Sequence, residues 1–507
     1  MPPRMLTIRP PFTEEFLQSS QRLSASEIAI ATEFISLGEH CISYMDAAIT
    51  RAGSQEELYE LTQQRKDMVQ QVLQHKNAIR CLRRLPFEIV SKFLVFALPY
   101  VEPDDFGETP WYLGHICRYW RDVALASPSL WSDIVIMRPN KYPTEKFQTQ
   151  LTRSSNSPLK VLLWSSSSSR GNPHVTEFLK VLVDCAPRWT NACIFINPTH
   201  WNLLASLRSR VPLLRYLRIG VSDFLDPDAK STELTNPLEI APALRDLTLE
   251  DISGLPHGLV LPFHQLTRLK LATTSESIAA ILQTTTNLEL ASLDLTDDPP
   301  DAVHPIIRLP HLRRLYLSSQ PFLEQLELPA LEEIYMVDTP PAPFLSSFVQ
   351  RCPTMKLKTL RLAWCTPAHI ARILEACPSV ETLGLQIMSS DKGDELLTLL
   401  TVQRSTSGVY TGIGPNLHSI ALGLDRVVVK HGLFVDMVES RWRLPADRDN
   451  GGSPFCRLRS AELLVVDEGN ALSASMERRL DVLKKEGLRI SLLQGSAANS
   501  ELLEWRI

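Results

Sequence analysis

Close cysteine pairs, long apolar runs and a dominant charge sign are all missing from this sequence, and glycine is scarce. The nine cysteines never lie two to four positions apart, which excludes the zinc and redox motifs built on that spacing. The most apolar run, 85–101, is interrupted by Glu88 and Lys92 and falls short of the ~20 residues that a membrane-spanning helix needs. Because 52 basic residues stand against 57 acidic ones, general binding to nucleic acids or to anionic membranes is disfavoured.

The start of the chain carries Arg4 and Arg9 but has no apolar segment behind them, so a secretory signal is not expected. We therefore expect reduced cysteines and a cytoplasmic or nuclear protein. The 507 residues allow roughly two to four domains.

Leucine is abundant in this sequence, in contrast to glycine. The chain has 78 leucines, and 42 of them lie between residues 201 and 400. Proline is also frequent, with 36 residues against 20 glycines. Since proline ends a helix and extends the residue before it, this composition predicts a leucine core whose elements are separated by proline.

Residues 1–84 are expected to form a helical hairpin. Two Ser-x-x-Glu capping boxes, at Ser24 and Ser54, each open a heptad pattern, and the phase slips at 52–54. Two helices joined by a turn explain the slip better than one long rod. The hairpin can pack on itself or dimerise as a coiled coil, and the second alternative implies self-association through residues 20–84. The heptad positions are Ile28, Ala31, Ile35, Gly38, Ile42, Met45, Ile49 and Ala52, then Leu58, Leu61, Arg65, Met68, Val72, His75, Ile79 and Leu82.

Aromatic residues are densest in the segment 85–137. The first helix predicted here opens at Pro86, and one of its faces is formed by Ile89, Phe93 and Phe96. A second helix from about residue 111 carries a stripe of Ile116, Trp120 and Val123. About 50 residues are too few for a strong independent core, so we expect apolar surface to be left for a partner.

Three motifs follow one another in this segment: Leu85-Pro86 with Glu88-Ile89, then Ile116-Cys117-Arg118-x-Trp120-Arg121, and then Ala124-Leu125-x-x-Pro128-x-Leu130-Trp131. The segment resembles the F-box domain, in the version found in fungal families that join an N-terminal coiled coil, an F-box and a leucine-rich tail. The resemblance implies docking onto a Skp-type linker protein and, through it, onto a cullin-RING ubiquitin ligase. The residues that it assigns to this contact are Leu85, Pro86, Ile89, Phe93, Trp120 and Leu125. The acidic stretch 101–109 is longer than the link in many F-boxes, which puts the affinity for the linker in question. A helical subdomain that merely caps the next domain is the alternative interpretation.

Residues 138–507 carry a recurring Leu-x-x-Leu-x-Leu pattern. It starts, with substitutions, at residues 214, 244, 266, 290, 312, 331, 357, 380 and 417, and less regularly at 458 and 488. This pattern resembles leucine-rich repeat proteins, whose strand-plus-helix units stack because one unit cannot bury its own apolar face. Of the Asn or Cys that the family places after each strand, only Cys365 is present in the units from 214 to 417. We therefore predict an irregular solenoid, most regular over 210–430.

Side chains alternate between the two faces of a strand. In each Leu-x-x-Leu-x-Leu unit, the residues just before and just after the second leucine are therefore expected on the concave, solvent-facing side. Both charge signs and three tyrosines occur at these positions, which suits a protein or peptide partner better than a polyphosphate. The candidate substrate-binding residues are Tyr216, Arg218, Arg268, Lys270, Arg314, Tyr316, Tyr335 and Arg361.

Nucleotide-binding loops, metal motifs and the common nucleophile motifs are absent from the sequence, so we expect no enzyme, no metal and no cofactor. The fold class predicted is multi-domain α and α/β, with a helical hairpin at 1–84, an F-box at 85–137 and an irregular α/β leucine-rich-repeat solenoid at 138–507. The expected function is that of a non-catalytic substrate receptor of a Skp-cullin-F-box ubiquitin ligase, which recruits a protein substrate through the repeats. An oligomeric interaction scaffold without a ubiquitin role is the alternative.

Overall fold

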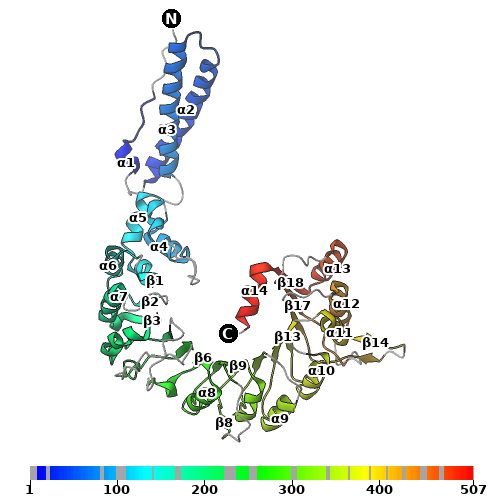
Figure 1. Cartoon of the computed structure of the whole chain (residues 1–507). Coiled ribbons are helices and arrows are strands. Elements are labelled where there is room, and N and C mark those ends of the chain that lie inside the picture. The colour runs from blue at the N-terminus through cyan, green and yellow to red at the C-terminus, as the bar shows by residue number, and fades with distance from the viewer. Residues whose placement is uncertain are drawn as a thin grey trace. The chain divides into compact units, whose positions relative to one another are not determined.

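The chain forms two compact units, Met1–Leu162 and Leu163–Ile507 (Figure 1). The computed structural model describes residues 8–18, 23–79, 85–98, 110–139, 142–165, 173–221, 236–250, 260–297, 305–337, 343–363, 366–387, 390–406, 409–424, 430–445, 454–466 and 473–505. Leu82, Cys365 and the acidic stretch 101–109 lie outside the described residues. No helix within these ranges is both long enough and apolar enough to cross a membrane.

A helical hairpin opens the first unit, with α2 at Ala25–Ile49 and α3 at Gln55–Ile79. The capping box at Ser24 is complete, whereas the second is changed: Glu57 donates its backbone N–H to Ser54, but its carboxylate accepts from Gly53. The two helices pack on each other through Phe34, Ile35, Met45, Met68 and Val72. The hairpin thus closes on itself along most of the predicted heptad positions.

Close packing in the hairpin depends on Gly38. A Cβ added there would lie 2.4 Å from the Cγ2 atom of Val72, so only glycine allows the helices to approach this closely. Near the same level α1, Glu14–Gln18, contacts α3, where the Gln74 amide donates to Glu14 at 3.1 Å. The rings of Phe12 and Phe34 enclose His75, which is fully buried.

Four short elements follow the hairpin. They are α4 at Phe87–Phe96, α5 at Arg118–Leu125, β1 at Asp133–Ile136 and α6 at Thr144–Arg153, with 3₁₀ turns at Tyr112–His115 and Pro128–Trp131. Their core contains Val90, Leu94, Val123, Leu130 and Trp131. The Trp131 indole N–H donates to the carbonyl of Ala124 at 2.7 Å, which satisfies its one buried polar atom. The first unit runs to Leu162 and therefore includes residues 138–162.

The second unit is a large parallel sheet with helices. Its strands are hydrogen-bonded in chain order, apart from two small pairs, β8 (Ile307–Arg308) with β10 (Leu326–Glu327) and β14 (Gln403–Arg404) with β15 (Tyr410–Thr411). After β2, Leu159–Trp164, at the unit boundary, the main strands are β3 Trp189–Ile196, β4 Tyr216–Val221, β5 Asp246–Glu250, β6 Arg268–Thr273, β7 Leu290–Leu295, β9 Arg314–Leu317, β11 Glu333–Met336, β12 Thr359–Ala363, β13 Thr382–Ile387, β16 Ser419–Leu424, β17 Ser460–Val465 and β18 Arg489–Gln494.

Helices α8 to α13 lie along the outer side of this curved sheet, and α14 lies on the opposite side, called the inner face below (Figure 1). The helices of the unit are α7 Pro173–Asp184, α8 Ser275–Leu282, α9 Pro343–Arg351, α10 Pro367–Ala376, α11 Ser390–Leu400, α12 His431–Trp442, α13 Ala474–Lys485 and α14 Gly495–Glu504. Parallel strands need such crossovers, because the chain must return to the same sheet edge before each new strand.

The repeated leucines fill the layer between sheet and outer helices. Leu217, Leu247, Leu269, Leu315 and Leu360 are at most 1% exposed and lie in register across neighbouring strands. Two of the predicted starts of the leucine pattern do not match the register of the strands. Strand pairing matches Leu290 with Arg314, so the unit placed at Leu290 begins two residues earlier, at the buried Leu288. In the last unit Arg489 pairs with Ser460, which shifts the pattern there by one residue.

Candidate functional site

An apolar surface is left open on α4 in the first unit. Phe87, Ile89, Phe93, Val95 and Phe96 are between 38% and 85% exposed, while Val90 and Leu94 turn into the core. Ile89, Phe93 and Phe96, spaced i, i+4 and i+7, share one side of the helix, and we call these three residues the open face. Since single exposed apolar residues are common but a concentration on one helix is not, the open face is a candidate protein-interaction surface.

The structure separates the residues predicted to bind the linker protein into two groups. Pro86, Ile89, Phe93 and Leu125 are exposed and available to a partner. Leu85 and Trp120 are half-buried against the core of the block, and the Leu85 carbonyl accepts a hydrogen bond from the Tyr119 hydroxyl at 2.9 Å. Their first role in this fold is therefore to hold α4 and α5 together. Ile116, expected on the stripe with Val123, is 55% exposed instead of packed beside it.

All eight candidate substrate-binding residues lie on the inner face of the second unit. Strand pairing aligns Tyr216 with Asp246 and Arg268, and it aligns Tyr316 with Tyr335. Their accessibility differs along the sheet. Arg268, Lys270 and Arg314 are exposed, Tyr216, Arg218 and Arg361 are half-buried, and Tyr316 and Tyr335 are only 5% and 1% exposed. The expectation that the two tyrosines face solvent is therefore wrong.

Helix α14 causes this burial. Its residues Ala498 and Leu502, together with Trp505 just after the helix, form one cluster with five strand residues. These five, called the covered face, are Tyr316, Tyr335, Ala363, Ala421 and Leu464. The Trp505 ring meets that of Tyr335 edge to face, with centroids 6.3 Å apart, and the Arg361 guanidinium lies 5.5 Å above the Trp505 ring. The C-terminal part of the inner face is thus closed by the chain's own helix.

Charged groups surround the docked helix. Arg361 pairs with Glu333, which also lies 3.4 Å from Arg314. Burial raises the pKa of the Glu462 carboxyl, and Glu501 of α14 raises it further, while Arg361 acts in the opposite direction. Glu462 and Glu501 repel each other, but Arg361 attracts both carboxylates, so charge interactions both favour and oppose the docking of α14.

The N-terminal part of the inner face holds a cluster of a different kind. The Trp164 and Phe195 rings stack 4.3 Å apart, and the Arg218 guanidinium lies 5.1 Å above the Phe195 ring. Arg218 also donates two hydrogen bonds to one oxygen of Glu250, at 2.5 and 2.9 Å. Burial raises the pKa of the neighbouring Tyr216 hydroxyl to about 12, so it stays protonated and can donate a hydrogen bond.

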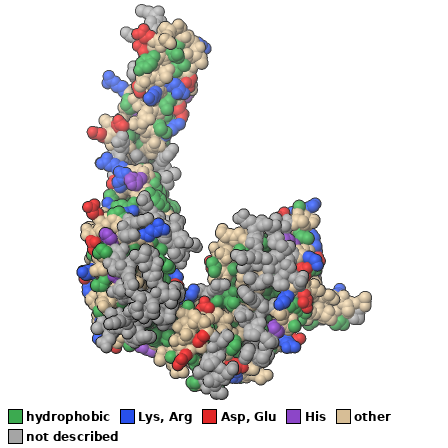
Figure 2. Space-filling view, in the orientation of Figure 1, with side chains coloured by type: hydrophobic (Ala, Val, Ile, Leu, Met, Phe, Trp, Pro, Cys, Tyr) green, Lys and Arg blue, Asp and Glu red, His purple; other side chains and the backbone are tan. Residues whose placement is uncertain are grey.

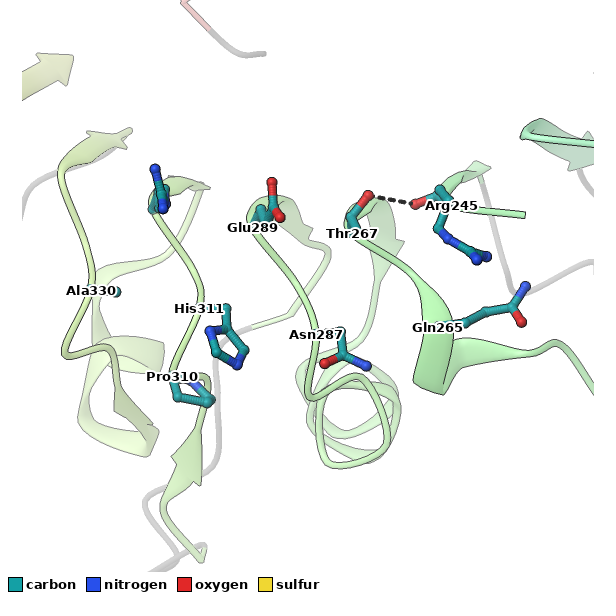
Figure 3. Close-up of a pocket in the computed structure, with 9 residues that line it drawn as sticks. Arg245, Gln265, Thr267, Asn287, Glu289, Pro310, His311 and Ala330 are labelled. Carbon is teal, nitrogen blue, oxygen red and sulfur yellow. Dashed lines mark hydrogen bonds between the residues drawn. The ribbon is translucent and has the colours of Figure 1, made fainter. Parts of the chain in front are cut away.

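An open polar pocket of about 530 Å³ lies at the edge where strands β5 to β9 begin. Figure 3 shows Gln265, Asn287 and His311 in one row, with Thr267 and Glu289 in a second row nearer the strands. Backbone hydrogen bonds link the second row, since Thr267 donates to Arg245 and Glu289 donates to Thr267. The pocket mixes both charge signs, as does the visible surface in Figure 2, and it suits polar side chains of a protein more than a polyanion.

Among the described residues, no three His, Cys, Asp or Glu side chains are grouped as a metal site would require. The acidic segment around 294–301 is described up to Asp297, whose carboxylate accepts from the Ser275 backbone N–H at 2.6 Å. That contact satisfies a backbone group at the start of α8, which is a structural role.

Comparisons with known proteins give little further guidance. No protein-family profile matches the chain, and no curated protein matches it. One solved structure that is similar in part is a structural-genomics protein of Bacteroides fragilis, with 12% identity and a TM-score of 0.28. The match covers 57% of this chain and 69% of that one. A likeness at this level supports no argument about function.

Closure of the inner face by α14 and the pocket at the strand starts were both missed by the sequence analysis. The spacing of Ala498, Leu502 and Trp505, at i, i+4 and i+7, was a visible sign of an amphipathic helix. Glycines at Gly384 and Gly423 within leucine-rich strands were a second sign, because glycine inside a strand often marks a close approach. The pocket gave no such sign, since its residues come from separate units of the pattern.

Proposed function

We propose that this chain is a non-catalytic substrate receptor of a Skp-cullin-F-box ubiquitin ligase, in which residues 85–137 dock onto the Skp-type linker protein. The open face of α4 carries the proposal, because it lies in the segment whose motifs resemble an F-box and exposes Ile89 and Phe93, two of the residues assigned to the contact. Each large apolar side chain that a partner buried there would contribute roughly 1.5–3 kcal/mol to binding.

The second unit is proposed to be an irregular leucine-rich-repeat solenoid that recruits a protein substrate. Sequential strand order and leucines buried in register support this interpretation. Since Tyr316 and Tyr335 lie under α14, the substrate contact falls to the open residues Arg268, Lys270 and Arg314. Ubiquitin transfer would be accelerated by proximity to the other ligase subunits, so this chain needs no catalytic residue.

Co-purification of the full chain with a Skp-type linker protein tests the first half of the proposal. Ile89→Asp with Phe93→Asp should abolish the complex, because it places two charges in an apolar contact while leaving the core intact. Leu85→Ala with Pro86→Ala should weaken it as well. The matched control is Glu145→Lys, which changes an exposed residue of α6 in the same unit and should retain the linker. Failure of the intact, folded chain to bind any Skp-type protein would contradict the proposal.

A specific observation supports the second candidate function, an oligomeric scaffold. Ile30, Leu37 and Tyr44 lie seven residues apart on α2 and are 46%, 48% and 56% exposed. Their spacing places them on one stripe outside the hairpin core, where a second copy could pack.

Light scattering of the full chain separates the two functions. A scaffold predicts a dimer or larger assembly that becomes monomeric in Leu37→Glu, whereas Ser43→Glu, at an exposed position of α2 outside that stripe, should leave the assembly intact. A monomer at all concentrations would remove the support for the scaffold.

A further inference from the structure

The groove beneath α14 is shaped for a helix. In β13 and β16, glycine occupies inner-face positions that leave little room for a side chain beside α14. A Cβ added to Gly384 would lie 2.9 Å from Cγ of Arg361 and 3.1 Å from the Trp505 ring, and one added to Gly423 would lie 2.6 Å from the Leu502 side chain. Ala363 and Ala421 keep the neighbouring positions low. Glycine and alanine are poor strand formers, so their presence here is explained by the close approach of the helix.

The sides of the groove are higher than its floor. Tyr316 and Tyr335 stand at one end, and Leu464 with the half-buried Leu493 stands at the other. Between these apolar ends the floor combines the small residues with Arg361, which stacks with Trp505, and Gln386, which accepts a hydrogen bond from the Tyr335 hydroxyl. Such a relief accommodates a helix whose stripe has a small residue, a leucine and an aromatic residue at i, i+4 and i+7, as Ala498, Leu502 and Trp505 do.

A single backbone turn delivers α14 to this groove. β18 ends at Gln494, and the helix begins at once with Gly495, whose φ of 59° is in the left-handed region that favours glycine. This turn sends α14 over the inner face, while α8 to α13 lie on the outer side (Figure 1). One turn therefore decides whether the groove is occupied.

The attachment of α14 is one-sided. Helix α14 contacts β17 and β18, and it packs on the covered face through Ala498 and Leu502. Leu503, on the opposite side of the helix, is 52% exposed. A helix held by one stripe can leave at a lower free energy than elements buried on two sides.

We infer that the inner-face groove over β11 to β17 is a helix-binding site, which α14 occupies in cis and which an amphipathic helix of a partner protein, with the same small-Leu-Trp stripe, occupies when α14 is released. The inference is independent of the ligase function, because linker binding by residues 85–137 is measured separately. While α14 fills the groove, a partner helix can bind only those chains whose groove is empty. The apparent affinity for the partner helix therefore equals its intrinsic affinity multiplied by the fraction of empty grooves.

A fluorescein-labelled synthetic peptide of residues 494–507 serves as the probe, and fluorescence anisotropy with the full chain is the measurement. Leu502→Asp with Trp505→Ala should vacate the groove and bind the peptide about tenfold or more tightly than the unaltered chain does. Leu503→Asp, on the exposed side of α14, is the matched control and should bind no better than the unaltered chain. Adding Gly423→Leu to the vacated chain should abolish binding by filling the groove.

Circular dichroism and a cooperative melt establish that the vacated chain is folded. A folded, vacated chain that binds the peptide no better than the unaltered chain would overturn the inference, and so would equal binding by Leu503→Asp. If the vacated chain does not fold, hydrogen exchange of the unaltered chain decides. Amides of α14 that exchange well before those of α13 and β17 support a releasable helix, whereas exchange only together with those elements overturns it.

Discussion

Two apolar surfaces of this protein are treated in opposite ways. The open face on α4 exposes three large apolar side chains, and the covered face on the second unit is closed by α14, with Tyr335 left 1% exposed. Both surfaces are apolar, so hydrophobicity alone does not tell them apart. The difference is whether the chain supplies its own cover, which teaches that the open face is the one available to another protein and that the covered face must first be vacated.

The largest expected effect comes from placing an aspartate on each of the two surfaces in turn. Tyr335→Asp buries a charge under Trp505 and removes the hydroxyl that donates to Gln386 at 3.2 Å, so we expect a loss of about 4–5 kcal/mol in the second unit. Phe93→Asp, at 51% exposure, should change stability by no more than about 0.5 kcal/mol. Hydrogen exchange of β11 and of α4 measures each effect locally. Similar losses at both sites would break the comparison.

A smaller effect is expected when the cover itself is weakened. Trp505→Ala removes the edge-to-face contact with Tyr335 and the stacking with Arg361, and it should destabilise the docking of α14 by about 3 kcal/mol. Protease cleavage within 495–505 under native conditions reports this change. Cleavage should accelerate there while α13 stays protected, and an unchanged rate would mean that Trp505 is not the anchor.

Adding a methyl group to the floor of the groove should destabilise the protein less than either Tyr335→Asp or Trp505→Ala. Gly423→Ala adds one methyl group that would meet the Leu502 side chain at 2.6 Å, and we expect a loss of about 1–2 kcal/mol as the helix shifts. Gly53→Ala, at a position with nothing within 4 Å, provides the control and should be neutral. Equal melting behaviour of the two variants would show that the floor of the groove tolerates a side chain.

The smallest expected effect concerns a third apolar surface, the buried core of the hairpin around His75. Burial lowers the pKa of His75 below its usual 6.5, with only the Gln71 carbonyl opposing this, so the folded hairpin holds the neutral ring. Protons then bind the unfolded chain more readily, and hairpin stability should be full above pH 6.5 and decline as the pH falls below it. The carboxylates nearby have other partners, since Glu14 accepts from Gln74 and Glu39 pairs with Lys76.

Urea unfolding followed by the helical signal of α2 and α3, at pH 7.5 and at pH 5.5, checks this decline. His75→Phe should flatten the difference between the two pH values while keeping the contact with Phe34. The covered face should show no matching change, because its strand residues include no histidine. A decline that persists in His75→Phe would assign the pH dependence to other groups.

Features that rest on local patterns could be predicted from the sequence. The capping box at Ser24, the hairpin turn near Gly53 and the α4 helix after Pro86 all follow from short-range geometry. The inner-face positions were also predicted correctly, because alternation within a strand fixes which residues share a face. Exposure of Tyr316 and Tyr335 was predicted wrongly, since the helix that buries them lies more than 150 residues further along the chain. The register at Leu290 failed because LELASLDL contains two overlapping leucine patterns.

By itself, the sequence determined a helical N-terminal region, a long leucine-patterned α/β region and the alternation of buried leucines with inner-face polar residues. These follow from the periods of helix and strand, which are local properties of the backbone. Only the tertiary structure decided which apolar surface stays open. Local periodicity shows that Ala498, Leu502 and Trp505 share a stripe, but it does not show which surface they cover. That choice rests on the turn at Gly495 and on the small residues at Gly384 and Gly423, which come together only when distant strands are aligned in the sheet.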